Sequence, residues 1–276
     1  MYASIHEAGA RCGRATACDD DRVTDLRALL DLETIDRNLY RAVAVVDEED
    51  PLYGGQVAAQ ALRAAGLTVP SDRVAHSLHG YFLRAGEATR RTVFRVSRDR
   101  DGGSFSARRV VAVQNGEVIL NMVCSFHRPQ GGPAEQVQPM PDVAAAEQLP
   151  DAELPRLVSF AGRVPEQPFA HRAPWPTRFW ARATADLGDD PLLHACALTY
   201  LSDIFTGVLP ARDGSASSRA SIDHSLWLHR PVDVNDWLLT DHHPQIAGGG
   251  RAWYTGTIYT RDGRVAASLA QETLYR

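Results

Sequence analysis

Three polar residues in the C-terminal half of the 276-residue chain stand in otherwise apolar stretches. Asp203 lies in CALTYLSDIFTGV, Ser221 precedes IDHSLWLH, and Gln271 lies in AASLAQETLY. A carboxylate in an apolar helix is costly unless it is paired or takes part in chemistry, although Asp203 could also bond a neighbouring backbone group. A carboxylate, a hydroxyl and a carboxamide are together suited to hold and deprotonate one water molecule.

What the sequence lacks narrows this chemistry further. All 29 basic residues are Arg, so no lysine can form a Schiff base or complete a P-loop. No G-x-S-x-G segment nominates a nucleophilic serine. The spacing of Cys and His matches no metal site, so we expect neither a metal nor a cofactor. His224 in IDHSLW is interpreted as a hydrogen-bonded structural histidine rather than a general base. Water attack on an activated carbonyl remains, and a thioester fits it better than an amide.

An internal repeat predicts the elements that position these residues. Helices are expected over Gly54–Gly66 in the first half and Pro191–Gly207 in the second, since glycine favours a helix end and proline a helix start. Each helix is followed by runs that are typical of long antiparallel strands. The Asn-Gly and Asp-Gly pairs at 115–116 and 262–263 predict two-residue type I′ hairpins.

Matching motifs in the two halves are separated by a nearly constant number of residues, but the halves differ in polarity at three positions. Arg84 and Arg230 are 146 positions apart, and other landmarks agree within one residue. The polar residues of the second half and their counterparts in the first are Asp203 and Leu62, Ser221 and Ala75, and Gln271 and Cys124. A duplicated fold that keeps polar groups in only one copy predicts a single chemical site, in the second unit.

A helix followed by a curved antiparallel sheet is an α+β unit, in which the sheet wraps around the helix and buries its apolar face. Two such units can pair their sheets edge to edge and so remove exposed edges. An amphipathic helix is expected at 23–32, docked on the core. We expect a flexible N-terminal extension over 1–22, a first unit over 23–128, a Pro-rich linker over 129–170 and a second unit, with the chemical site, over 171–276.

Composition and charge exclude several classes of protein. The net charge of −5 argues against a nucleic-acid partner, which would need a basic face. The longest apolar runs fall short of the roughly 20 residues that a membrane span requires. Four cysteines without a C-x-x-C pair are typical of reduced thiols, and the N-terminus lacks the apolar segment of a signal peptide. A cytoplasmic location is therefore expected.

Several ordered motifs together resemble the acyl-CoA thioesterase II (TesB-type) family. They are LYGGQVAAQAL, HGYFLRAG, DGGSFSARRV, QNGEVI, YLSDI, ASIDHSLWLHRP and TRDGRVAASLAQE. The resemblance runs from about Leu26 to the C-terminus. It implies a tandem (double) hotdog fold, which agrees with the repeat, and a homo-oligomer.

The resemblance also implies an activity and the residues that carry it. It implies hydrolysis of medium- to long-chain fatty acyl-CoA to fatty acid and CoA, without a covalent acyl-enzyme. The family's water-activating Asp, Thr or Ser, and Gln match Asp203, Ser221 and Gln271. A non-catalytic acyl-CoA-binding protein on the same fold is the alternative. A hotdog enoyl-CoA hydratase is disfavoured, because VDVNDW has no histidine in place.

Further residues are expected to contact the substrate. Backbone N–H groups near Gly54 and Gly55, at a helix N-terminus, are candidates to stabilise the oxyanion. Arg108 and Arg109 are candidates for the CoA phosphates, since only Arg can supply a cation in this chain. Adjacent residues of a strand face opposite sides, so at most one of these arginines is expected to reach the ligand.

Overall fold

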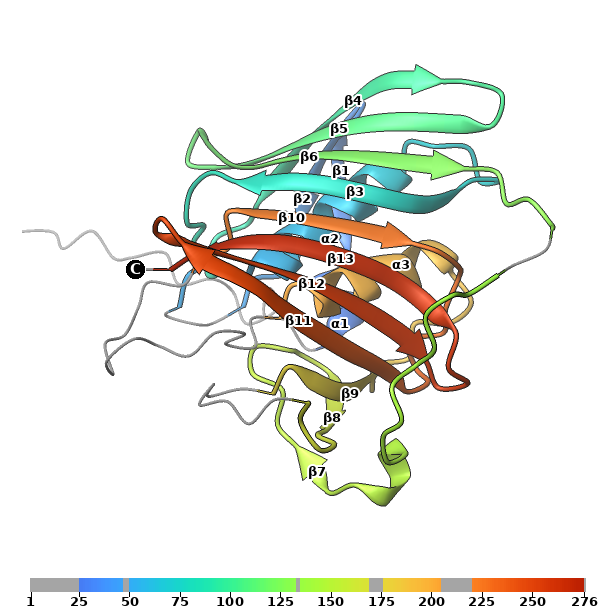
Figure 1. Cartoon of the computed structure of the whole chain (residues 1–276). Helices are drawn as coiled ribbons and strands as arrows, with labels where there is room; N and C mark the ends of the chain where they lie inside the picture. Colours follow the sequence, from blue (N-terminus) through green and yellow to red (C-terminus); the bar gives the residue numbers. More distant parts are fainter. Residues whose placement is uncertain (1–24, 47–49, 133–134, 169–175, 205–219, 276) are drawn as a thin grey trace, which may run out of the picture.

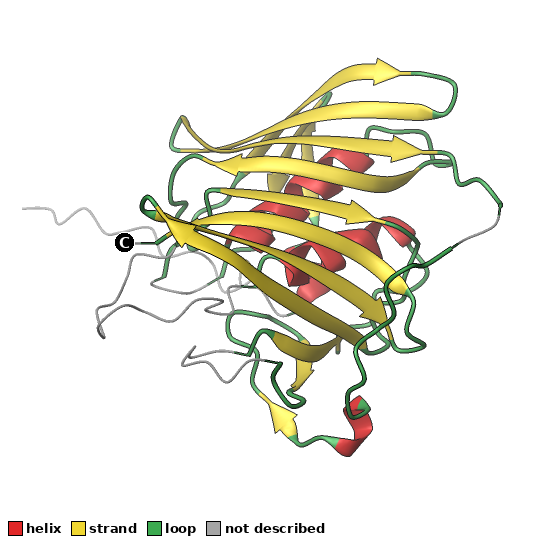
Figure 2. Ribbon diagram, in the orientation of Figure 1, coloured by secondary structure: helices red, strands yellow, loops and turns green. Residues whose placement is uncertain are grey.

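The computed structural model describes residues 25–46, 50–132, 135–168, 176–204 and 220–275. The range 1–22, expected to be a flexible extension, lies outside these residues. Two sheets join into one curved surface, and two long helices lie side by side against the same face of it (Figures 1 and 2).

The first unit comprises α1 (Leu26–Leu29), β1 (Leu32–Asp36), β2 (Leu39–Ala42), α2 (Gly54–Gly66), β3 (Val74–Phe82), β4 (Val93–Asp101), β5 (Phe105–Gln114) and β6 (Glu117–His127). The second unit comprises the 3₁₀ turn η2 (Ala146–Gln148), β7 (Asp151–Ala152), β8 (Phe160–Arg163), β9 (Arg178–Ala183), α3 (Pro191–Ser202), β10 (Asp223–Leu228), β11 (Leu238–Gly248), β12 (Arg251–Thr260) and β13 (Val265–Leu274). Among these elements, none of the helices is long and apolar enough to cross a membrane.

The strand order is symmetric about the junction of the two units. It reads β1-β2-β4-β5-β6-β3 and then β10-β13-β12-β11-β9-β8-β7. At the junction, β3 and β10 pair antiparallel with His79 opposite Ser225. These two residues are 146 positions apart, which is the offset of the sequence repeat, so each is the counterpart of the other. A local two-fold axis therefore passes through this pair.

The core lies between the sheet and the two helices. In α2, which is rich in Ala, almost every residue is buried, and α3 is buried over most of its length. The helices run antiparallel and close together: a Cβ on Gly55 would lie 2.5 Å from the Tyr200 carbonyl oxygen, and one on Gly66 would lie 2.5 Å from Leu192 Cδ1. At the start of α3, Pro191 occupies the first turn and Asp190 accepts a bond from the Leu192 N–H at 2.9 Å.

Three local expectations need correction. The helix expected over Pro191–Gly207 ends at Ser202, with Asp203 as its C-cap. The helix expected at 23–32 is the single turn α1, because Leu32 already begins a strand paired with β2. The range 129–170, expected to be a linker, contains β7 and β8, and β8 pairs with β9, so the sheet of the second unit begins before 171. The four-residue strand β8 was not predicted because the sequence around it is rich in proline. Within β8, Gly162 leaves room for the Leu154 side chain.

The two hairpins also differ from each other. Asn115 and Gly116 both have positive φ, 51° and 79°, as a type I′ turn requires. In the second pair only Gly263 does, at 83°, and Thr260 accepts a bond from the Gly263 N–H at 2.9 Å. This is the longer hairpin in which a type I turn precedes a left-handed glycine. The two-residue turn expected at 262–263 is therefore wrong.

Candidate active site

Asp203 lies where the two helices meet. It is the C-cap of α3, its side chain is only 2% exposed, and it faces the N-terminus of α2. The backbone N–H of Gly55 donates to its carboxylate. A Cβ on Gly54 would overlap Asp203 Oδ2, so only glycine permits this approach. Because no side chain caps the N-terminus of α2, the Asp203 carboxylate accepts a bond from one of the free N–H groups in the first turn of α2. The helix dipole favours a negative charge at this end.

Ser221 and Gln271 meet this carboxylate from the sheet. Gln271 lies on β13, where alternate residues face the helices, and Ser221 forms an isolated bridge with Thr273 just before β10. Gln271 Nε2 lies 2.6 Å from Asp203 Oδ1 and 2.6 Å from Ser221 Oγ. Ser221 Oγ donates to the same Oδ1 at 3.2 Å. The structure thus brings the three sequence-predicted residues into one closed triangle of hydrogen bonds.

His224 fixes the orientation of the Gln271 amide. It is buried on the inward face of β10, and its Nδ1 lies 2.5 Å from Gln271 Oε1. Since a carboxamide oxygen only accepts, Nδ1 carries the proton, and the amide nitrogen of Gln271 is turned towards Asp203. His224 Nε2 lies 2.8 Å from Ser202 Oγ. His224 is therefore hydrogen-bonded at both ring nitrogens, as expected for a structural histidine.

Burial and hydrogen bonding act in opposite directions on the basicity of the Asp203 carboxylate. Burial raises the pKa of Asp203 above its ordinary value. The charge of His224 and the hydrogen bonds from Gln271, Ser221 and Gly55 act in the opposite direction. A carboxylate with a raised pKa is a stronger base and suits proton abstraction near neutral pH.

A further polar group at the site escaped the sequence analysis. Tyr254 on β12 stands directly opposite Gln271 in the sheet and is 2% exposed. Its hydroxyl has no hydrogen-bond partner among the described residues, and burial, together with the negative charge of Asp203, raises its pKa. The pairing of β12 with β13 was expected, so counting back from the hairpin would have found this neighbour of Gln271.

The first unit has no such polar group at the corresponding positions. The end of α2 corresponds to the end of α3, so Gly66, rather than the sequence-aligned Leu62, stands in the place of Asp203. The counterparts of His224 and Gln271 are the buried Leu78 and Cys124. The Cys124 thiol is free, and burial raises its pKa well above the ordinary value. A buried thiol of this kind stays protonated and inert.

Arg108 is a structural residue. It is 1% exposed, and its Nε–H and four Nη–H groups all donate within the protein. The acceptors are Thr68 Oγ1, the Arg100, Ala107 and Thr68 carbonyl oxygens, and Asp101 Oδ1. Since a guanidinium has five N–H donors, none is left for a phosphate. The expectation that Arg108 binds CoA needs correction for this reason.

Arg109 faces the other side of β5, as the alternation of the strand predicts. It is exposed and lies 3.3 Å from Asp99, so the structure does not bring it to the three polar residues. Arg84 lies two residues after Phe82, whose ring would lie 3.0 Å from a Cβ on Gly54. Its side chain is 53% exposed and pairs with Glu117 at 3.1 Å. Among the described residues no cluster of His, Cys, Asp and Glu side chains could hold a metal ion.

Comparison with known proteins assigns both halves of the chain. Residues 47–127 match the family profile "Acyl-CoA thioesterase N-terminal domain" and residues 134–275 match "Acyl-CoA thioesterase C-terminal domain". Acyl-coenzyme A thioesterase 8 of Mus musculus is 33% identical over 99% of this chain and 95% of its own. Acyl-CoA thioesterase 2 of Haemophilus influenzae is 34% identical over 93% of this chain and 98% of its own.

Solved structures agree with these matches. The acyl-CoA thioesterase II TesB2 of Mycobacterium marinum is 39% identical, with a TM-score of 0.77 over 91% of this chain and 96% of that one. A hotdog-fold protein of Alicyclobacillus acidocaldarius has a TM-score of 0.73 at 17% identity, over 91% and 97% of the two chains. The tandem hotdog fold expected from the sequence is confirmed.

Proposed function

Because this chain belongs to the acyl-CoA thioesterase II (TesB-type) family, we propose that it hydrolyses medium- to long-chain fatty acyl-CoA to fatty acid and CoA with Asp203, Ser221 and Gln271 activating one water. The observation that carries the assignment is the shared acceptor: Ser221 and Gln271 both donate to Oδ1 of a buried carboxylate, at 3.2 and 2.6 Å. Three groups that converge so closely can hold one water in the place of their mutual bonds.

In this mechanism Asp203 is the general base. A water bonded to its carboxylate, to Ser221 Oγ and to the Gln271 amide loses a proton to Asp203 as it attacks the thioester carbonyl. The tetrahedral intermediate then expels CoA as a thiolate. His224 supports this step from outside, because it keeps the Gln271 amide nitrogen directed at the water.

The developing oxyanion needs donors in a site without bulk water. The N-terminus of α2 supplies a positive dipole end at Gly54 and Gly55, although the Gly55 N–H already bonds Asp203. The buried Tyr254 hydroxyl, which lacks a partner among the described residues, is a second donor available to the carbonyl oxygen. For the CoA phosphates, Arg84 replaces Arg108 as a candidate and would exchange its ion pair with Glu117 for a phosphate, and Arg109 stays a prediction.

The test is to measure release of free CoA from acyl-CoAs of increasing chain length. Asp203→Asn keeps the size of the side chain but removes the base, and we expect kcat/KM to fall by about 10²–10⁴-fold. Asp236→Asn, at an exposed position in the second unit, is the matched control and should leave kcat/KM unchanged.

Two outcomes would contradict the proposal. Near-normal turnover by Asp203→Asn would remove Asp203 from the mechanism. Saturable binding of acyl-CoA by the wild-type protein without any CoA release would identify a binding protein on the same fold. The chain-length series tests the medium- to long-chain assignment in the same assay.

A further inference from the structure

The two-fold relation between the units gives the active site a counterpart elsewhere in the fold. Side-chain hydrogen bonds repeat in the two units with nearly the same offset as the strands. An Arg84 Nη1–H donates to the Val118 carbonyl at 2.9 Å, and the Arg230 Nε–H donates to the Val265 carbonyl at 2.8 Å. The arginines are 146 positions apart and the acceptors 147. The ends of β3 and β10 are thus built alike.

The helices obey the same relation with their own offset. The N-caps of α2 and α3, Tyr53 and Asp190, are 137 positions apart, which places Gly54 at Pro191 and Asp203 at Gly66. The place where α2 begins beside Asp203 therefore has a counterpart where α3 begins, at Pro191. On the sheet, Ser221 corresponds to Ala75 by the offset of 146.

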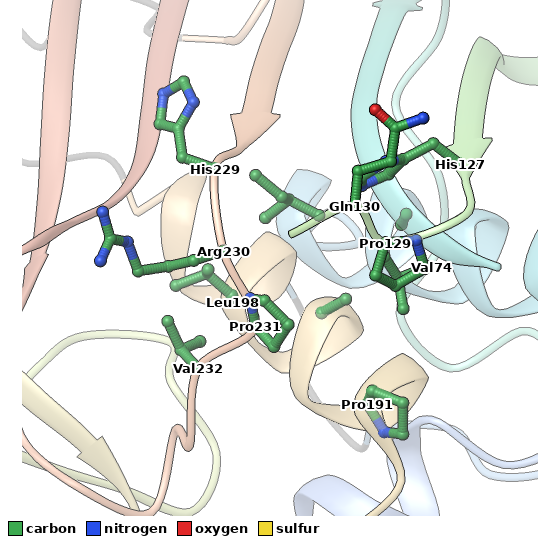
Figure 3. A pocket seen from close by; sticks show the side chains of 13 residues that line it. Val74, His127, Pro129, Gln130, Pro191, Leu198, His229, Arg230, Pro231 and Val232 are labelled. Atoms are coloured by element: carbon green, nitrogen blue, oxygen red, sulfur yellow. The ribbon is translucent and has the colours of Figure 1, made fainter. Parts of the chain in front are cut away.

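A cavity of about 260 Å³ lies at this counterpart position. Pro191, Ala75 and Leu228 line it, and these are the counterparts of Gly54, Ser221 and Phe82. The remaining lining residues are Val74, His127, Pro129, Gln130, Ala195, Leu198, His229, Arg230, Pro231 and Val232. In Figure 3 the end of β10 forms one wall, the end of β6 with Pro129 and Gln130 forms the other, and α3 forms the floor.

The interior of this cavity is apolar. Its walls and floor present aliphatic side chains and proline rings, while the polar groups lie at its rim. Figure 3 shows the His229 ring and the Arg230 guanidinium directed away from the opposite wall. The His229 ring bonds Ser268 Oγ at 2.9 Å, and the Arg230 Nε–H is held by Val265. The cavity is thus suited to an aliphatic chain whose polar end stays at the surface.

The start of α3 offers no site for a polar reacting group. Pro191 has no N–H, and Asp190 already accepts the bond from the Leu192 N–H. The residues that replace the three polar groups, Gly66, Ala75 and Cys124, hold no base that could activate water. Burial keeps the Cys124 thiol protonated. An acyl chain bound here would therefore lack the buried carboxylate that serves as the base at Asp203, and we expect no hydrolysis at this position.

We propose that this cavity is a second, non-hydrolytic site for the fatty acyl chain. The identification of the ligand class rests on the proposed function, since it takes the cavity as the two-fold counterpart of an acyl-thioester site. The small residues Ala75 and Ala195 keep the space open. The chain could belong to an acyl-CoA or to a free fatty acid, because both present the same aliphatic tail with an anionic head.

The test is a binding stoichiometry measured on the whole chain by titration calorimetry. S-decyl-CoA, a thioether that cannot be hydrolysed, and decanoate are titrated separately. The wild type is expected to bind two molecules per chain of at least one probe. Ala195→Leu fills the cavity from the floor and Val232→Phe from one wall, and each is expected to reduce this number to one.

The probe that loses a binding event identifies the source of the chain as acyl-CoA or fatty acid. One molecule per chain of both probes in the wild type would overturn the proposal, as would two molecules per chain in both filled variants. If one filled variant fails to fold by circular dichroism, the other decides.

Hydrolysis of decanoyl-CoA separates this inference from the proposed function. The filled variants should keep kcat/KM within about threefold of the wild type, since they lie outside the catalytic residues. Wild-type protein that releases no CoA would contradict the proposed function, whatever the binding number.

Discussion

At the scale of single residues, the site depends on how one buried carboxylate is solvated. The Asp203 carboxylate is buried away from water, and burial raises its pKa. Hydrogen bonds from Ser221, Gln271 and the Gly55 backbone N–H replace those to water and limit the cost of burying the charge. The same donors also limit its basicity. The pKa of Asp203 therefore depends on how many of these hydrogen-bond donors are present.

We predict that Ser221→Ala moves the acid limb of the pH profile upward. The Ser221 hydroxyl lowers the pKa of Asp203, so its removal lets that pKa rise further. Activity requires the ionised carboxylate, and it should therefore be lost at higher pH than in the wild type. The measurement is kcat/KM for an acyl-CoA across the acidic range. Ser225→Ala, on the face of β10 opposite His224, is the control and should leave the limb in place.

A limb that stays fixed or moves downward in Ser221→Ala would show that another group controls the acid side of the profile. The magnitude of kcat/KM is a separate readout, because Ser221 also bonds the attacking water in the proposed mechanism. The position of the limb reports the base alone.

At the scale of elements, the beginning of α2 and the end of α3 are matched to each other. Gly54 and Gly55 allow the first turn of α2 to approach Asp203 and Tyr200 more closely than any side chain would. The carboxylate in turn takes the place of a side-chain cap for α2. One contact thus serves helix stability and the geometry of the site.

We predict that Gly54→Ala disables the site more than it destabilises the fold. The new methyl group would overlap Asp203 Oδ2 and must displace it. A displacement on the order of 1 Å costs about 10²-fold in rate, and overpacking costs about 1–3 kcal/mol of unfolding free energy. Enzyme kinetics and urea unfolding measure the two effects.

Gly103→Ala is the matched control, since nothing lies within 4 Å of its added Cβ. It should change neither rate nor stability. Wild-type kcat/KM in Gly54→Ala would mean that the carboxylate is free to move without consequence, against the proposed role of Asp203.

At the scale of the whole molecule, the two units share one core. Phe94, Val110 and Leu62 of the first unit belong to the same buried cluster as Leu226 and Tyr254 of the second. The sheets are continuous through β3 and β10, and the helices pack against each other. Separation of the units would expose both the strand edges and the helix contact, so cooperative unfolding of the whole chain is expected.

The tryptophans provide a test of this cooperativity. All five lie in the C-terminal half, at positions 175, 180, 227, 237 and 253. Phe94→Ala removes a fully buried ring from β4 of the first unit and should cost about 3–5 kcal/mol. We predict that the tryptophan fluorescence transition in urea shifts to lower denaturant by the same amount as the circular dichroism transition.

Independent units would give a different result, with the fluorescence transition of Phe94→Ala unchanged from the wild type. Phe105→Ala, at an exposed position of β5, is the control and should shift neither transition appreciably.

The sequence alone determined those features that depend on near neighbours along the chain. The bounds of α2 follow from its terminal glycines, and the hairpin at Asn115 follows from the two residues that take positive φ. The repeat predicted two units, and the strand order on either side of β3 and β10 confirms them. Such features are encoded by spacings of two to four residues or by a comparison of the two halves.

Only the tertiary structure decided what depends on groups far apart in the chain. It showed that all five donors of Arg108 are taken inside the protein, that β8 joins the second sheet, and that Gly55 bonds Asp203. It also left open the cavity around Ala195. The physical reason is that burial and hydrogen-bond saturation are set by partners up to about 150 positions away, and no local pattern specifies which of them a side chain will meet.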